Sequence, residues 1–210
     1  MRQPKSVAGL DDLGRVRLSQ HFYLREFLYS EIASLHGLPN IPDNPDLAIA
    51  AGRGLCEHLL EPLQAAFGRI AIRSAYRSST VNGFGSARQR EGKAGYPCGS
   101  NAMNHAAHIW DRRDARGGMG AMASIAVPWF ADRYAQGADW RGLAWWIHDH
   151  LPYSSLCFFP RNAAFNIGWH EVPVRRIDSY AAPRGCLTRP GRTNWAGSHA
   201  EWYAGFPTPQ

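Results

Sequence analysis

The sequence predicts an α+β fold in which helices flank an antiparallel sheet. Two observations lead to this prediction. Segments with helical apolar spacing and short strand-like segments follow one another in the order helix, strand, hairpin, helix, strands, which does not suit a doubly wound parallel sheet. The 210 residues fit one domain, and 45% hydrophobic with 19% charged residues is a globular balance. A chain of this length buries a sizeable core without disulfides.

The first third of the chain predicts a lead-in and two helices. Residues 1–20 form the N-terminal lead-in, and residues 21–37 carry apolar side chains near helical spacing before a glycine. The proline-rich segment 38–46 is a connector. The best helix covers residues 46–68, ends at a glycine, and contains Pro62, which should kink or divide it. Its apolar stripe consists of Leu47, Ala51, Leu55, Leu59 and Leu63.

The middle of the chain predicts strands and one long loop. Residues 69–78 alternate apolar and polar side chains, which is typical of a strand. Residues 83–103 are rich in Gly, Ser and basic residues and predict a long loop, a class that is often functional. Residues 105–111 and 121–130 should be the strands of a hairpin whose turn is residues 112–120.

The last third predicts one helix, two strands and an irregular end. Residues 139–152 form an amphipathic helix, and residues 154–160 and 164–172 are short strands. The remaining residues, 173–210, are rich in Pro, Gly and Arg and show no period, so we expect an irregular C-terminal extension. The central domain would then span residues 21–172.

Charge and cysteine usage restrict the partners. The net charge of +6 favours anionic polymers such as nucleic acid or a bacterial wall. No run of five basic residues occurs, so we expect no nucleic-acid partner. None of the four cysteines is in a CxxC pair, which predicts reduced thiols rather than a zinc ribbon. The N-terminus has no apolar region of a signal peptide, and no run of 18 apolar residues predicts a membrane span.

The segment "NHAAHIWDRRD", residues 104–114, concentrates possible zinc ligands. Imidazole and carboxylate groups both suit zinc. On a regular strand His105 and Asp111 share one side, whereas His108 faces the other unless a bulge intervenes. We therefore expect Asp111 and either His105 or His108 as ligands, with His105 favoured by parity.

A third ligand has to come from elsewhere, and "GWHE" supplies His170 on another predicted strand. Alone, each of these histidines would be read as a hydrogen-bonded structural residue. Asp114 fits a turn, because Asp-x-x-Gly sequences commonly form one.

Together these segments resemble the M15 family of zinc D,D- and L,D-peptidases, in its smaller wall-degrading branch with the Hedgehog/DD-peptidase-type fold. The resemblance runs from about residue 22 to 171 and rests on "AYRSSTVN", the His/Asp segment, the "WWI" helix and "GWHE". It implies a bound zinc ion and peptide stems of bacterial peptidoglycan as substrate. It also implies that Arg77 binds a substrate carboxylate or the oxyanion, with Tyr76, Ser78 and Trp169 lining the substrate site. The alternative for Arg77 is a residue that closes a surface turn.

The sequence departs from the family pattern in three places, one of which is Met103 in the position of the family serine if His105 is the ligand. The family motif Ser-x-His-x-x-Gly-x-Ala-x-Asp is one residue shorter here if His105 is the ligand. Relatives often carry an acidic general base three residues before the last histidine, where this chain has Ile167. Glu171 is the nearest substitute, and it must reach the zinc-bound water to act.

Two functions follow as expectations. The first is a zinc peptidase that cleaves peptidoglycan stems, by a hydroxide formed on zinc with Arg77 stabilising the oxyanion. The second is an inactive binding or structural module that keeps the peptidase fold. A phage virion or gene-transfer particle is the expected setting for either, with other virion proteins as further partners and cytoplasmic residence before delivery.

Overall fold

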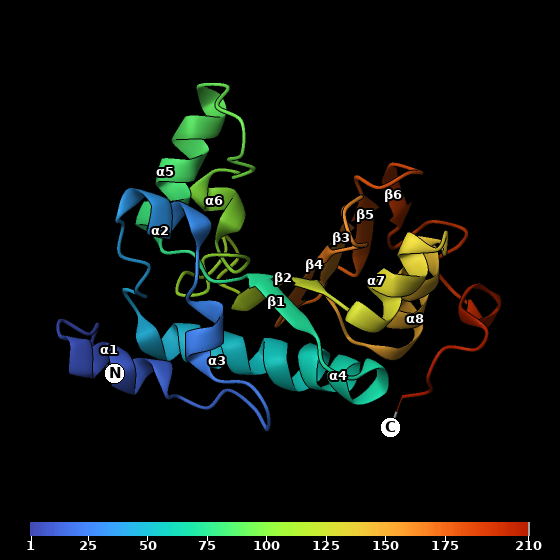
Figure 1. Cartoon of the computed structure of the whole chain (residues 1–210), viewed down its shortest axis with the longest axis horizontal. Coiled ribbons are helices and arrows are strands. Elements are labelled where there is room, and N and C mark those ends of the chain that lie inside the picture. Colours follow the sequence, from blue (N-terminus) through green and yellow to red (C-terminus); the bar gives the residue numbers. More distant parts are fainter. Residues whose placement is uncertain (210) are drawn as a thin grey trace.

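The computed structural model describes residues 1–209 and confirms the α+β class (Figure 1). The helices are α1 (Val7–Gly14), α2 (Glu31–His36), α3 (Pro45–Leu55), α4 (Glu61–Phe67), α5 (Ser79–Arg90), α6 (Asn101–Asn104), α7 (Pro128–Ala135) and α8 (Trp140–His150). The 3-10 helices η1 (Leu24–Phe27) and η3 (Ala200–Tyr203) and the π-helix η2 (Cys56–Leu60) complete the helical elements. The strands are β1 (Ala71–Ser74), β2 (Gly120–Ala126), β3 (Ser155–Phe158), β4 (Phe165–His170), β5 (Arg176–Ser179) and β6 (Gly185–Thr188).

The six strands form one mixed sheet in the order β1-β2-β4-β3-β5-β6. The prediction of an antiparallel sheet is wrong at one place, because β3 and β5 run parallel with Ser155 opposite Arg176. The other four neighbouring pairs are antiparallel. β5 and β6 come from the segment expected to be irregular. A four-residue strand flanked by Pro and Gly contains too few alternating residues to be recognised in the sequence.

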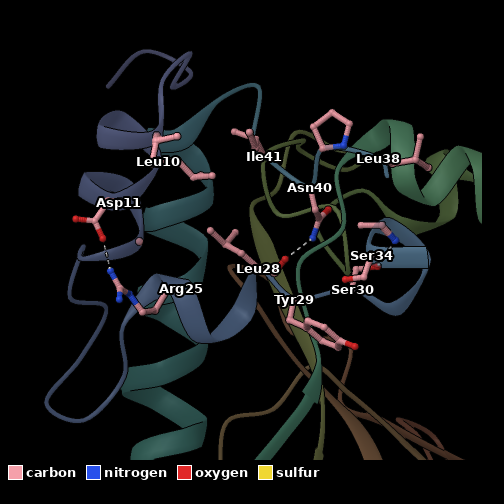
Figure 2. A pocket seen from close by; sticks show the side chains of 14 residues that line it. Leu10, Asp11, Arg25, Leu28, Tyr29, Ser30, Ser34, Leu38, Asn40 and Ile41 are labelled. Carbon is pink, nitrogen blue, oxygen red and sulfur yellow. Dashed lines mark hydrogen bonds and ion pairs between the residues drawn. The ribbon is translucent and has the colours of Figure 1, made fainter. Parts of the chain in front are cut away.

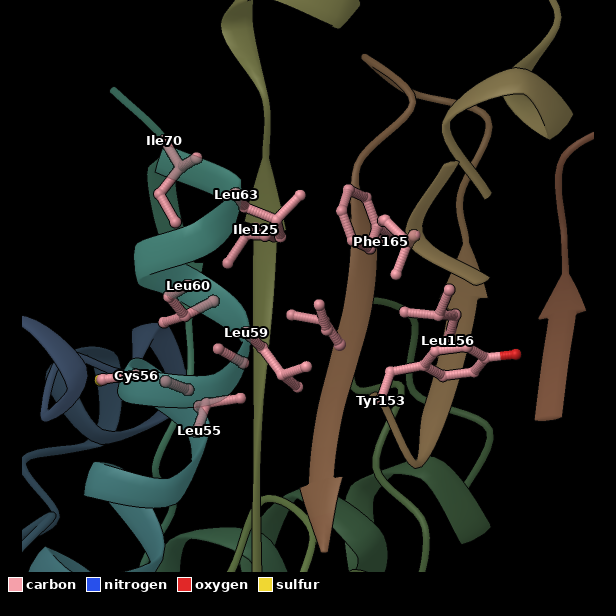
Figure 3. Close-up of a cluster of buried hydrophobic side chains, with 14 of the residues drawn as sticks. Leu55, Cys56, Leu59, Leu60, Leu63, Ile70, Ile125, Tyr153, Leu156 and Phe165 are labelled. Atoms are coloured by element: carbon pink, nitrogen blue, oxygen red, sulfur yellow. The ribbon is translucent and has the colours of Figure 1, made fainter. Parts of the chain in front are cut away.

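One face of the sheet is buried under helices. Leu55, Leu59 and Leu63 of the α3–α4 stretch point at Ile125 and Phe165 of the sheet (Figure 3). Side chains of α8 join the same core. Because neighbouring side chains on a strand alternate between faces, the residues in between lie on the opposite face. There they form a partly exposed polar row in register, made of Ser124, Asn166, Cys157 and Asp178.

The helix predicted at residues 46–68 is confirmed, with an irregularity before its proline. Asn44 caps it by accepting a hydrogen bond from Leu47 N at 3.3 Å, and Pro45 occupies the first turn, where no N–H is needed. Pro62 has no N–H to donate to the carbonyl one turn earlier. The backbone widens into the π-helix η2 just before it and then continues as α4.

Three further sequence-based assignments are wrong. Residues 105–111 form a turn rather than a strand: Ala106 has φ +53°, and His105 makes only an isolated bridge to Ile109. The loop expected at residues 83–103 contains most of α5 and the start of α6. The helix expected at residues 21–37 breaks into η1 and α2, with a serine cap between them. Among residues 1–209, no helix is long and apolar enough to cross a bilayer.

Candidate functional site

Two of the predicted zinc ligands, His108 and Asp111, are buried and hydrogen-bonded to the backbone. His108 is 7% exposed, and its Nδ1 donates to Ala75 O at 2.8 Å. Burial, with a contribution from the nearby Arg77, lowers the pKa of His108 to about 3, so the ring is neutral. Asp111 is 2% exposed, and its Oδ2 accepts from Asp43 N at 2.8 Å. Asp111 thus anchors the connector before α3, although its Oδ1 has no hydrogen-bond partner.

The other two predicted ligands lie in different surroundings. His105 is partly exposed and ends the short helix α6. His170 ends β4 and lies over two glycines, since a Cβ added to Gly118 would fall 2.5 Å from its ring. Its Nε2 is 3.3 Å from Asp114 Oδ2, so Asp114 pairs with His170 as well as closing a turn. Backbone hydrogen bonds from the turn, led by that of Gly118, lower the pKa of Asp114.

Glu171, the predicted general base, is engaged by a backbone N–H and by an arginine. Its Oε2 accepts from Met119 N at 2.6 Å and lies 3.3 Å from Arg113 Nη1.

The predicted substrate residues are mostly buried. Tyr76 is fully buried beside Trp110, and burial raises its pKa. Ser78 caps α5 by accepting from Val81 N at 3.2 Å. Trp169 faces the helix side of the sheet, because a Cβ on Gly54 would lie 2.6 Å from its ring. None of these three lies on the polar face of the sheet.

Arg77 is the exception, because its charge is buried without a carboxylate. The residue is 9% exposed, its Nη1 contacts Cys98 Sγ at 2.7 Å, and its buried Nε has no hydrogen-bond partner. Burial lowers the pKa of Arg77, while Cys98 opposes this. Burying a guanidinium with one thiol as its side-chain partner costs free energy. Its remaining N–H groups can still donate hydrogen bonds to an anion.

A group that the sequence analysis missed is the closest set of metal-type ligands. Within residues 1–209, three His, Cys, Asp or Glu ligand atoms lie within 4.8 Å of one another only in the group His148, Asp149 and His199. The predicted set His105, His108, Asp111 and His170 is not brought together in this way. The run His-Asp-His at residues 148–150 was a visible signal, but its third partner lies about fifty residues later in a segment without a period.

Asp149 is the centre of this group. Its Oδ1 is 2.7 Å from His199 Nδ1, and its Oδ2 accepts from His199 N at 2.9 Å and from Tyr203 Oη at 2.7 Å. Burial acts to raise the pKa of Asp149, but the hydrogen bonds from His199 and Tyr203 outweigh it and the pKa is lowered. The ring of His199 stacks on Trp145 with centroids 3.9 Å apart.

Hydrogen bonds hold both imidazole rings of this group through both of their nitrogens. His199 Nε2 faces Asn194 O at 3.0 Å while Nδ1 faces the Asp149 carboxylate. Both partners are hydrogen-bond acceptors, so each ring nitrogen of His199 faces an acceptor oxygen. His148 Nε2 donates to Trp195 O at 3.0 Å, and its Nδ1 is 2.7 Å from Tyr153 Oη. Burial lowers the pKa of His148.

Two cavities lie in different parts of the protein. One of about 460 Å³ lies beside the group. Its lining consists of His148, Asp149, His150, Arg175, Gly197, Ser198 and Tyr203. A second cavity, of about 580 Å³, lies between α1, η1 and α2 and is mainly apolar, with the Asp11–Arg25 ion pair at one end (Figure 2). Among the described residues, the second cavity holds no cluster of metal-type ligands.

Comparisons with known proteins identify no family. No family model, no curated protein and no solved structure matches the chain.

Proposed function

We propose that the protein is a non-hydrolytic binding module that recognises peptide stems of bacterial peptidoglycan through their free carboxylate. The observation that carries the proposal is the buried Arg77 guanidinium, whose only side-chain partner among residues 1–209 is the Cys98 thiol. A carboxylate supplies two acceptors that match a guanidinium. The net charge of +6 also draws the protein to an anionic wall polymer.

Binding rather than turnover is favoured by the state of the expected catalytic groups. His108 and Asp111 are buried in hydrogen bonds with the backbone, and Glu171 is paired with Arg113. A zinc-dependent hydrolytic centre needs an ion with an open position and a base near its water. The protein would then act as a wall-binding part of a virion or gene-transfer particle.

The test is the affinity for a synthetic stem peptide with a free C-terminal D-alanine carboxylate, compared with the same peptide amidated. We expect the wild type to bind the free acid at least about tenfold more tightly, since charged hydrogen bonds contribute about 1.5–3 kcal/mol. Arg77→Lys should lose this preference because a lysine cannot form two parallel hydrogen bonds. Arg53→Gln, at an exposed position on α3, is the control. Equal binding of both peptides by a folded wild type would refute the proposal.

A zinc peptidase is the second candidate, favoured by the presence of one group that could hold a metal ion. Zinc bound there would need to activate water for attack on a stem peptide, and the cavity beside the group offers room for substrate. Release of stem peptides from purified sacculi, lost on chelation and restored by zinc, would establish this candidate. No release with zinc-loaded protein would exclude it and leave the binding module.

A further inference from the structure

The His148–Asp149–His199 group joins two distant parts of the chain. His148 and Asp149 lie at the end of α8, whereas His199 belongs to the segment 194–207, which runs over this helix after β6. Trp146 Nε1 donates to Pro207 O at 2.8 Å and extends the same contact. The segment has little other regular structure, only the short η3. The group adds to the attachment of this segment, together with the packing of Phe206 against Phe67 and Trp129.

The donor types and their supports fit a transition-metal ion. Two imidazoles and one carboxylate are common zinc ligands, and the three ligand atoms lie within 4.8 Å of one another. His199 Nε2 donates to Asn194 O, which is how a metal-binding histidine is normally oriented through its other nitrogen. Asp149 is likewise held by Tyr203 Oη.

The three ligand atoms, which lie within 4.8 Å of one another, have to shift before they can share one ion. His199 Nδ1 and Asp149 Oδ1 are 2.7 Å apart, and tetrahedral zinc would separate two such ligands by about 3.3 Å. His148 would exchange one of its present contacts, to Trp195 O or to Tyr153 Oη, for the ion. The cavity next to Asp149 gives an entry path and space for a water ligand.

We propose that His148, Asp149 and His199 bind one Zn²⁺ ion, and that this ion fixes the segment 194–207 on α8. The site shares no residue with the surroundings of Arg77, so the proposal goes beyond the binding module and does not depend on it. Its role is structural, because it links a helix to a segment with little regular structure of its own.

The experiment is calorimetric titration of chelator-treated full-length protein with zinc chloride at pH 7.5, together with thermal unfolding. We expect one zinc per chain and a melting temperature that rises with zinc concentration. Asp149→Asn and His199→Gln should each weaken zinc binding more than about 100-fold, since even residues behind the ligands change metal affinity 10–100-fold. His58→Gln, an exposed histidine of η2, should bind as the wild type does.

X-ray absorption of the zinc-loaded wild type gives a readout that does not require folded variants. We expect two imidazoles and oxygen ligands without sulfur. The absence of zinc binding, unchanged affinity in Asp149→Asn, or a sulfur-containing shell would overturn the proposal. Loss of zinc in a His105→Gln/His108→Gln double variant, with Asp149→Asn unaffected, would instead place the ion at the sequence-predicted segment and overturn it too. Stem-peptide binding is measured separately, so either proposal can fail alone.

Discussion

The buried His108 makes the stability of this protein fall in acid by a predictable amount. Its pKa is lowered from 6.5 to about 3 because burial and the neighbouring Arg77 disfavour the charged ring. Between these two values the unfolded chain binds a proton that the folded chain does not, so acid favours unfolding. The contribution is complete above pH 6.5 and is lost as the pH falls toward 3.

The size of the effect follows from the two pKa values. With 1.36 kcal/mol per pKa unit, the folded state loses about 2 kcal/mol by pH 5 and about 3.3 kcal/mol by pH 4 from His108 alone. Other titrating groups add their own pH dependence, so the comparison needs a matched variant. His108→Asn keeps a donor near the position of Nδ1 for Ala75 O but cannot be protonated.

The assay is urea unfolding of both proteins at several pH values from 7.5 to 4. We expect the wild type to lose about 2 kcal/mol more unfolding free energy than His108→Asn when the pH is lowered from 7.5 to 5. A constant difference over this range would show that His108 is not held neutral, and the reasoning about its burial would be refuted.

Three further substitutions test the packing. Gly54→Ala should destabilise the folded protein by about 1–3 kcal/mol in thermal or urea unfolding, because the new Cβ would lie 2.6 Å from the Trp169 ring. An unchanged stability would mean that this ring is not packed on α3. Gly83→Ala is the matched helical control, since its Cβ meets nothing closer than 3.5 Å, and it should stabilise by about 0.5–1 kcal/mol. Asp111→Asn should cost about 1.5–3 kcal/mol by weakening the charged acceptor for Asp43 N, and an unchanged midpoint would contradict the anchoring role of Asp111.

Local patterns predicted the long elements well. The leucine stripe of residues 46–68 and the tryptophan-rich helix at residues 139–152 both have many apolar side chains at helical spacing, and both are helices. The strands around residues 71–74, 155–158 and 165–170 also occur where alternation predicted them. Such elements bury one side over several turns or strand residues, so the period is written into the sequence.

The His/Asp segment shows why the candidate site could not be predicted in the same way. Parity along a strand suggested that His105 and Asp111 share one side, but Ala106 adopts a left-handed conformation and turns the chain. A single residue with positive φ leaves no periodic trace. The two side chains then take separate places, His105 at a helix end and Asp111 under the connector before α3.

By itself, the sequence determined the α+β class, the long helices, most strands and the unusual Arg77 in "AYRSS". Only the tertiary structure decided that β3 and β5 are parallel, that Arg77 is buried against Cys98, and that His199 meets Asp149 at the end of α8. The physical reason is the separation along the chain of the residues that interact. Secondary structure follows from side chains a few residues apart, whereas a charge is paired or left unpaired by whichever residues the packed core brings beside it.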